Sequence, residues 1–209
     1  MYSHNIPFWV PRLYPNYRWH GPEREEPTVY LTFDDGPIPE VTPWVLETLE
    51  NEDVKGTFFC VGENVLRHPT IAQEIKEAGH TLGNHTHTHI NGWSTNTETY
   101  LSDAKRAKEA LEDTIGDSVR LFRPPYGRVR KAQATSILGQ HEIVMWSVLT
   151  GDFDLKLQPV DCLRRAIKYT RPAAIVVFHD SLKAEERIKG ALRAYIQTLK
   201  DQGYSFGVL

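Results

Sequence analysis

Short apolar runs alternate with helix-like segments along most of the chain, and this alternation limits the folds that the chain can adopt. The runs with strand character cover residues 28–33, 56–61, 80–83, 119–122, 142–148, 173–178 and 204–208. The segments with helical periodicity cover residues 42–51, 70–78, 97–115, 131–138, 160–169 and 184–202. Strands that alternate with helices are typical of a parallel sheet or barrel with crossover helices. We therefore predict an α/β fold of this kind in one domain.

The first 27 residues differ from the rest, because they are rich in proline and aromatic residues and show little periodicity. We interpret residues 1–27 as an extended segment that packs on the domain formed by residues 28–209. This segment has no basic region followed by an apolar core, and no stretch of the chain has the length of a membrane span. The pattern predicts a cytoplasmic protein without a membrane partner.

The overall charge and the cysteine content exclude several classes of partner and site. A net charge of -3, with 40% hydrophobic and 24% charged residues, is ordinary for a globular protein and gives no basic footprint for nucleic acid. The two cysteines, Cys60 and Cys162, lie far apart in the sequence. Cys60 sits in an apolar run, so we expect a buried free thiol and no disulfide framework.

Ionisable residues follow five of the predicted strands at the point where each strand ends. In parallel α/β folds, the loops after the C-terminal ends of the strands converge on one face, where active sites are built. We therefore expect these side chains to meet in one cleft rather than to be scattered over the surface. They are Asp34 and Asp35, His85 and His89, Arg123, Asp152, and His179, which Asp180 follows.

The segment GNHTHTHI has the spacing of a metal site. His85 and His89 are four residues apart, which places two imidazoles on one side of a turn. A carboxylate from Asp34 or Asp35 would complete a site of two histidines and one carboxylate, with positions left open for water and substrate. A solvated histidine-rich loop is the alternative. We expect His87 to face away and to be a surface or packing residue.

Arg123 and His179 have the sequence context of residues that support chemistry. Arg123 precedes a Pro-Pro turn that fixes its loop, which suits an arginine that holds a carboxylate. His179 ends a fully apolar run on the expected active face, which favours a general acid or base over a structural histidine.

Five short motifs follow one another between residues 32 and 179. They are TFDDG at Thr32–Gly36, HTHTH at His85–His89, RPPYG at Arg123–Gly127, WSVLTGDF at Trp146–Phe153 and VFH at Val177–His179. In this order they resemble the motifs of the polysaccharide deacetylase family, which shares the NodB homology domain (carbohydrate esterase family 4). The resemblance covers roughly residues 28 to 208. It implies a distorted (β/α) barrel, with residues 28–209 as the catalytic domain.

The resemblance also implies roles for individual residues. Asp34 would be the catalytic base, oriented by Arg123, which Asp152 would brace. His179, kept as imidazolium, would be the general acid, and the backbone N–H of Tyr126 would help to form the oxyanion hole. Zn²⁺ is the first divalent metal expected, although Co²⁺ and similar ions also suit the ligand set. The ligands would be Asp35, His85 and His89.

Two motifs depart from the family pattern. The fourth usually reads D-x-x-D-W, but here Leu149 replaces the first Asp and Phe153 replaces the Trp. In the fifth, Val177 replaces the usual Leu and would make a smaller wall for the acetyl group. These changes bear on substrate preference more than on chemistry. The substrate would contact Pro125, Tyr126, Trp146, Leu149, Phe153 and Val177, although core packing is an equal alternative for Trp146.

The resemblance implies a metal-dependent hydrolase that removes N-acetyl groups from N-acetylglucosamine units of peptidoglycan or a chitin-type oligomer, releasing acetate. One alternative is an O-acetyl esterase that acts on a polysaccharide such as acetylated xylan. Another is a catalytically silent carbohydrate-binding domain, which the altered fourth motif favours but the retained Asp34 and His179 oppose. We expect a monomer or a weak oligomer whose partner is the glycan.

Overall fold

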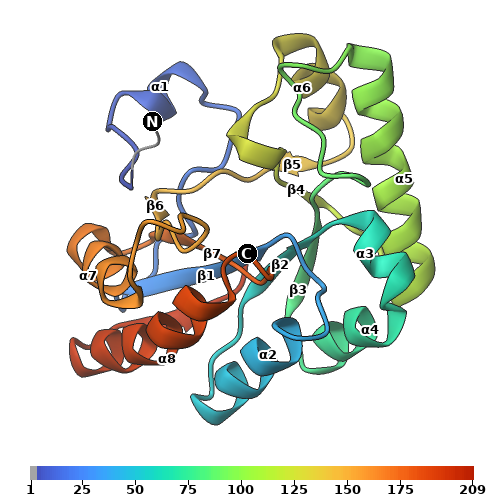
Figure 1. The fold of residues 1–209 in the computed structure, drawn as a ribbon. Helices are drawn as coiled ribbons and strands as arrows, with labels where there is room; N and C mark the ends of the chain where they lie inside the picture. Colours follow the sequence, from blue (N-terminus) through green and yellow to red (C-terminus); the bar gives the residue numbers. More distant parts are fainter. Residues whose placement is uncertain (1–3) are drawn as a thin grey trace.

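The computed structural model describes residues 4–209, which form a curled sheet of parallel strands with helices on its outer side (Figure 1). The strand order is β5-β4-β3-β2-β1-β7-β6, and β8 pairs with the first half of β1. All of the strand pairs are parallel. The strands are β1 (Thr28–Asp34), β2 (Thr57–Cys60), β3 (Thr81–Asn84), β4 (Leu121–Phe122), β5 (Glu142–Ile143), β6 (Val148–Leu149), β7 (Ile175–His179) and β8 (Ser205–Gly207).

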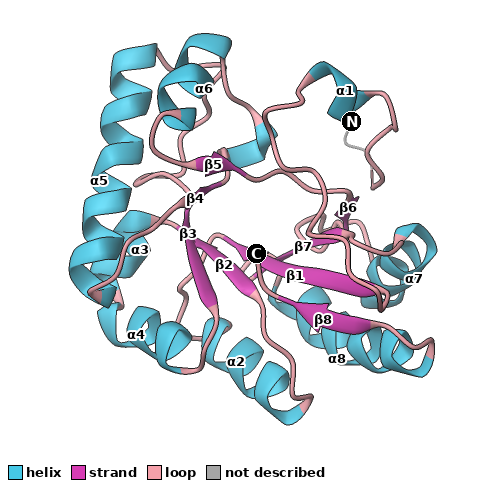
Figure 2. Cartoon of the chain, turned by 180° about the vertical axis from the view of Figure 1, so that it is seen from behind, coloured by secondary structure: helices cyan, strands magenta, loops and turns pink. Residues whose placement is uncertain are grey.

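The helices surround the strands, as the view from behind also shows (Figure 2). Apart from α1, which precedes β1, they lie in the connections between successive strands, as crossover connections between parallel strands require. They are α1 (Val10–Leu13), α2 (Thr42–Asn51), α3 (Gly62–Arg67), α4 (Pro69–Glu77), α5 (Thr97–Ile115), α6 (Lys131–Leu138), α7 (Pro159–Tyr169) and α8 (Glu185–Asp201).

The central strand β1 is buried along its whole length, which explains why its sequence is nearly continuously apolar. Leu31 and Phe33 belong to the main core cluster, together with Leu192 of α8. Tyr30 points to the other face, where it belongs to a cluster with Phe59. Burial on both faces holds the end of β1 rigidly, and this end carries the aspartate pair.

The barrel is open between β5 and β6, which are the two ends of the strand order. The N-terminal segment covers this region, because Arg18 forms a parallel bridge with Val144 and Asn5 forms an antiparallel bridge with Val148. A third bridge joins His20 to Ala174. The segment contains the short helix α1 and otherwise no regular helix within the described residues. The domain boundary between residues 27 and 28 stays a prediction.

The predicted strand at 142–148 is wrong, because the chain forms two short strands, β5 and β6, with irregular backbone between them. The cause is Arg123, whose Nε and Nη2 donate to the carbonyl oxygens of Val144 and Met145 at 3.3 and 2.9 Å. Consecutive carbonyl groups of a strand point to opposite sides. A backbone that turns both of them toward one guanidinium therefore cannot continue the strand.

The other expected elements are present, with ends that differ by one or two residues, which is the usual uncertainty of helix and strand boundaries. Helices at 42–51, 97–115 and 131–138 have the predicted bounds. Helix α3 was not predicted. Cys60 and Cys162 are both buried free thiols, as expected for the first of them.

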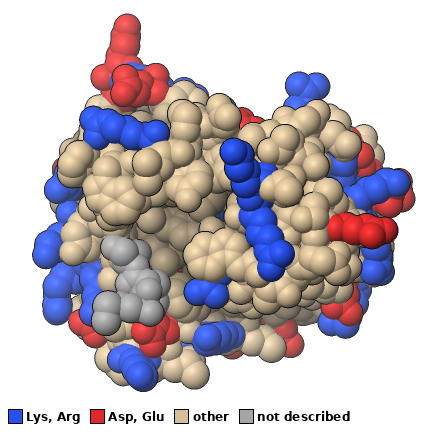
Figure 3. All heavy atoms as spheres, turned by 90° about the horizontal axis from the view of Figure 1, so that it is seen from above, with Lys and Arg blue, Asp and Glu red and all other residues tan. Residues whose placement is uncertain are grey.

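The surface carries charges of both signs. Figure 3 shows lysine and arginine side chains interspersed with aspartate and glutamate, and no continuous basic patch covers this face. Within the described part of the chain, none of the helices combines the length and the apolar character needed to cross a membrane.

Candidate active site

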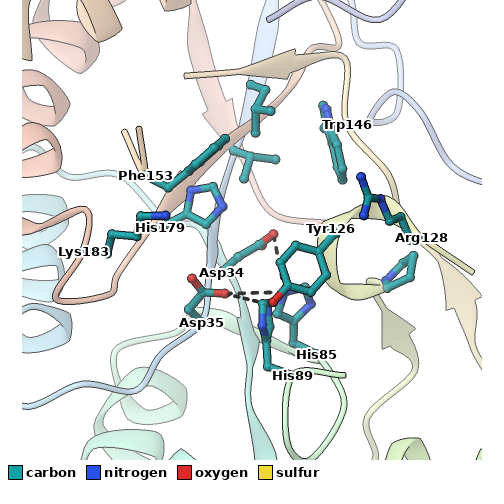
Figure 4. A pocket seen from close by; sticks show the side chains of 13 residues that line it. Asp34, Asp35, His85, His89, Tyr126, Arg128, Trp146, Phe153, His179 and Lys183 are labelled. Atoms are coloured by element: carbon teal, nitrogen blue, oxygen red, sulfur yellow. Dashed lines mark ion pairs between the residues drawn. The ribbon is translucent and has the colours of Figure 1, made fainter. Parts of the chain in front are cut away.

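The carboxyl ends of the strands converge on one cleft of about 380 Å³ (Figure 4). It contains charged and apolar side chains from the ends of β1, β6 and β7 and from the loops that follow β1, β3, β4, β5, β6 and β7. The clustering predicted from the strand ends is therefore present in the structure. The lining residues are Asp34, Asp35, His85, His89, Pro124, Tyr126, Arg128, Trp146, Leu149, Phe153, Val177, His179 and Lys183.

Asp35, His85 and His89 form a three-donor cluster, a name that we keep for these residues. Their ligand atoms all lie within 4.8 Å of one another. Oδ1 of Asp35 is 3.2 Å from Nε2 of His89 and 3.7 Å from Nε2 of His85. Asp35 and His89 have positive φ angles of 85° and 55°, which are uncommon for residues with a Cβ. Such backbone conformations concentrate at functional sites.

His85 is held in the tautomer that a metal ligand needs. Its Nδ1 lies 2.7 Å from the carbonyl oxygen of Arg123, so Nδ1 carries the proton and donates it. Burial lowers the pKa of His85 to about 4, so the ring is neutral and Nε2 offers a lone pair to the cleft. A hydrogen bond to the second ring nitrogen is the usual support of a histidine ligand.

The carboxyl group of Asp35 is also suited to a cation. Burial raises its pKa, but a hydrogen bond from His89 and the nearby imidazoles of His179 and His85 outweigh this and hold it well below its usual range. An anionic oxygen beside two imidazole nitrogens is a donor set that divalent transition metals prefer. The residues present therefore fit a divalent metal ion.

The histidine loop is fastened to helix α5 by Asp103. Oδ1 of Asp103 accepts hydrogen bonds from the backbone N–H groups of His87 and Thr88 at 2.7 and 3.0 Å, and Oδ2 accepts one from the Thr88 hydroxyl at 2.8 Å. His87 lies within this loop but is buried against α5, where Arg106 Nη2 donates to its Nε2 at 3.1 Å. His87 is thus a packing residue, one of the two alternatives expected for it.

Asp34 lies beside the three-donor cluster and is fixed by Arg123. The fully buried guanidinium of Arg123 donates from Nη1 to Oδ1 of Asp34 at 2.6 Å and to Oγ1 of Thr32 at 2.8 Å. Its Cζ also lies 4.0 Å from the centroid of the Phe59 ring. Oδ2 of Asp34 is left facing the cluster, 3.9 Å from Nε2 of His85. The predicted contact between Arg123 and Asp34 is therefore present.

The predicted contact between Asp152 and Arg123 is wrong. Asp152 is fully buried and pairs with His179 instead, with Oδ1 2.8 Å from the ring Nδ1 and Oδ2 accepting the backbone N–H of His179 at 2.7 Å. The physical reason is the strand order, because β6, which precedes Asp152, pairs with β7, which ends at His179. Strand β4, which precedes Arg123, lies on the far side of β1.

The environment keeps His179 protonated. Burial alone would lower its pKa, but the charge and the hydrogen bond of Asp152, together with Asp35 and Asp34, raise the pKa to about 9. Arg187 in turn donates from Nε to the backbone carbonyl of Asp152 at 2.6 Å, which anchors the loop that carries this aspartate. A histidine that is protonated at neutral pH can serve as a proton donor.

Apolar side chains form the remaining walls of the cleft. Trp146, Leu149, Phe153 and Val177 all line it, as expected of substrate-contacting residues. The Phe153 and His179 rings meet edge to face, with their centroids 5.0 Å apart.

Tyr126 also lines the cleft, whereas Pro125 does not, and its contact with substrate stays a prediction. Tyr126 packs its ring against His89, with the centroids 4.7 Å apart. Pro125 is buried outside the lining, and Pro124 lines the cleft instead. The left-handed backbone at Tyr126, with φ 60°, makes the turn that separates the two prolines from the exposed ring.

Asp180 contributes to the site and was not assigned a role. Its Oδ1 accepts the backbone N–H of Gly36 at 3.0 Å, and the Thr42 hydroxyl donates to its Oδ2 at 2.6 Å. It thereby holds the turn that follows Asp35. Burial raises the pKa of Asp180 to about 8, with a further contribution from the charge of Asp35. Its place directly after a strand-end histidine was the signal that could have identified it.

Arg128 and Lys183 line the cleft and were missed as well. Each lies a few residues beyond a strand end, where an isolated basic residue in a sequence has the appearance of ordinary solvated surface.

Comparison with known proteins finds relatives that belong to the family whose motifs the sequence resembles. The family model described as polysaccharide deacetylase matches residues 21–146. A peptidoglycan-N-acetylglucosamine deacetylase from Bacillus cereus is 39% identical over 146 residues, which cover 69% of this chain and 52% of the relative. Another protein of that name from the same organism is 31% identical over 190 residues, which cover 90% of this chain and 88% of the relative.

A solved peptidoglycan N-acetylglucosamine deacetylase has the same fold, with a TM-score of 0.89 and 32% sequence identity. The similarity covers 98% of this chain and 95% of the other, which confirms the predicted distorted (β/α) barrel. The match to the first Bacillus cereus relative spans only about half of that protein's length.

Proposed function

Because the chain belongs to the polysaccharide deacetylase family, we propose that it hydrolyses the N-acetyl groups of N-acetylglucosamine units in a glycan and releases acetate. The observation that carries this proposal is the arrangement of two groups around the three-donor cluster. Asp34, whose position Arg123 fixes, lies on one side as a proton acceptor. His179 borders the same cleft as a proton donor, because its pKa is raised to about 9.

A divalent metal ion would be held by the three-donor cluster, and we propose Zn²⁺ as the first choice, because imidazole and carboxylate ligands suit it. A bound ion of this kind polarises a carbonyl group and lowers the pKa of a coordinated water molecule. Three protein ligands leave room for both water and substrate. The neutral Nε2 of His85 and the anionic Asp35 support this assignment.

The side chains divide the proton transfers between them. Asp34 takes the proton from the water molecule that attacks the acetyl carbonyl, while Arg123 keeps its carboxylate in place. His179 donates its proton to the amine as the carbon–nitrogen bond breaks, which leaves a free amino sugar and acetate. Asp152 stabilises the imidazolium until then. The backbone N–H of Tyr126 is proposed to stabilise the oxyanion of the tetrahedral intermediate.

The walls of the cleft fit a small acyl group. Val177, Leu149 and Trp146 provide an apolar surface for the acetyl methyl group, and Phe153 packs beside the general acid. The names of the relatives support peptidoglycan as the glycan, and a chitin-type oligomer carries the same N-acetylglucosamine unit. All of the proposed catalytic residues come from one chain, so we expect a monomer or a weak oligomer to be active.

An acetate-release assay tests the proposal. The chain is stripped of metal with a chelator, reloaded with Zn²⁺ or Co²⁺, and supplied with N-acetylglucosamine oligomers, peptidoglycan fragments or acetylated xylan. We expect acetate from the first two substrates, dependent on added metal, and little from xylan. Release from xylan alone would identify an O-acetyl esterase. No release from any substrate, with metal shown to be bound, would indicate a carbohydrate-binding domain without activity.

A further inference from the structure

Two cationic side chains lie at the cleft without a role in the proposed chemistry. Arg128 follows the turn after β4, and Lys183 follows the loop after β7. In the strand order, β4 and β7 lie on opposite sides of β1, which carries Asp34. Figure 4 accordingly shows Arg128 and Lys183 on either side of the reacting groups. Both are exposed, so a bound molecule can reach them.

Neither cation has an acidic partner among the described residues. No carboxylate within residues 4–209 forms an ion pair with Arg128 or Lys183, although Lys189 on nearby α8 pairs with Glu185 at 2.6 Å. Their close neighbours are aromatic rings instead. The Cζ of Arg128 lies 5.1 Å from the centroid of the Trp93 ring, and Nζ of Lys183 lies 5.9 Å from that of Phe153. Such cation–π contacts orient a cation and leave its N–H groups available.

The wall that carries Arg128 is held in place by side-chain hydrogen bonds. Arg130 Nη2 donates to the carbonyl oxygen of Trp93 at 2.5 Å. Gln133 Nε2 donates to the carbonyl oxygens of Gly92 and Thr95 at 3.0 and 3.2 Å. The loop of Trp93 is therefore fixed against the start of helix α6, although the ring of Trp93 is 59% exposed. A loop that is already held in place loses little conformational entropy when a ligand binds to its exposed aromatic ring.

The segment of Lys183 is fixed in a comparable way. Arg187 donates from Nη2 to the carbonyl oxygen of Lys183 and from Nε to that of Asp152. The backbone beside Lys183 is thus tied to the loop that positions the general acid. Both cations therefore occupy defined places relative to the reacting groups.

We propose that Arg128 and Lys183 bind carboxylate groups of the glycan on either side of the reacting sugar. This inference rests on the proposed function. The cleft would then select an anionic glycan of the peptidoglycan type over a neutral chitin-type oligomer. In peptidoglycan, the sugars next to N-acetylglucosamine carry lactyl groups that end in carboxylates or peptides, whereas chitin has no such charge. A guanidinium presents a planar set of donors that matches a carboxylate in bidentate fashion.

Three substrates with equal numbers of sugars isolate the effect of charge. They are an N-acetylglucosamine oligomer, a peptidoglycan strand with free lactyl carboxylates, and the same strand with these carboxylates converted to amides. kcat/KM is measured on each for the metal-loaded wild type, Arg128→Gln, Lys183→Gln and the double variant. Arg120→Gln is the matched control, because it removes an exposed positive charge that lies outside the cleft.

We expect the wild type to prefer the carboxylate strand over its amide, mainly through a lower KM. The ratio of kcat/KM between these two strands should fall about ten- to hundred-fold in the double variant, as for the loss of a charged hydrogen bond. Arg120→Gln should keep the wild-type ratio. Added salt should reduce the preference, because it screens exposed charges.

A wild type that cleaves the acid and the amide equally would overturn the inference, as would a ratio unchanged in the double variant. An equal loss on all three substrates would also overturn it, because the cations would then bind the sugar chain in general. In each of these cases the deacetylase proposal still stands. If the wild type releases no acetate from any substrate, the proposed function itself fails.

Discussion

The ring of His179 and the carboxylate of Asp152 form a hydrogen bond of 2.8 Å, and the same carboxylate accepts the backbone N–H of His179 at 2.7 Å. One buried aspartate therefore fixes both the ring and the main chain of this histidine. Because Asp152 is negatively charged, it also stabilises the imidazolium. The pairing links the loop after β6 to the end of β7, two strands that are neighbours in the sheet.

The first prediction concerns the pH dependence of activity. Burial lowers the pKa of His179, but Asp152 is the largest contribution that raises it, to about 9. A general acid must be protonated, so kcat should fall as the pH rises through about 9. Asp152→Asn removes the charge and should move this alkaline limb to lower pH. Profiles of kcat between pH 6 and 10 measure the limb, and an unmoved limb would show that Asp152 does not tune the acid.

The second prediction concerns the base. Asp34→Asn keeps an oxygen that can accept the hydrogen bond from Arg123 but cannot take a proton from water. Turnover should fall by more than roughly 10²-fold, as is typical for loss of an acid–base group. Metal content, measured by elemental analysis, should stay at the wild-type level. Retained turnover would refute the role of Asp34 as base.

The third prediction separates the histidines of one loop. His85→Ala removes a donor from the three-donor cluster and should weaken metal binding by more than the roughly 10–100-fold that follows loss of an outer-shell partner. His87→Ala is the matched control, because His87 packs against Arg106 on α5 and not on the cluster. It should keep its metal. Equal metal loss in both variants would mean that the loop as a whole, and not a ligand, had been disturbed.

The fourth prediction concerns the general acid. His179→Gln should slow cleavage of the amide by roughly 10²–10⁴-fold, because the amine leaves poorly without a proton. An aryl acetate provides the control, since its phenolate leaves without protonation, and its hydrolysis should be much less affected. An equal loss on both substrates would argue against proton donation by His179.

The candidate site was predictable where the signal is local. The aspartate pair after 28–33 and the spacing of His85 and His89 both identify donors at strand ends, and the three-donor cluster unites them. The prediction for 142–148 failed, because the side chain of Arg123 draws two consecutive carbonyl groups out of the strand. That contact joins residues about twenty positions apart and leaves no trace in local periodicity.

By itself, the sequence determined the alternation of strands and helices and the residue types at the strand ends, since both follow from side-chain periodicity and chain order. Only the tertiary structure decided which of these residues pair. Asp152 and Arg123 each follow a strand, but β6 lies beside β7 whereas β4 lies across β1. Asp152 therefore pairs with His179, and Arg123 reaches Asp34. Partners in a parallel barrel depend on strand order in space, which the order along the chain does not specify.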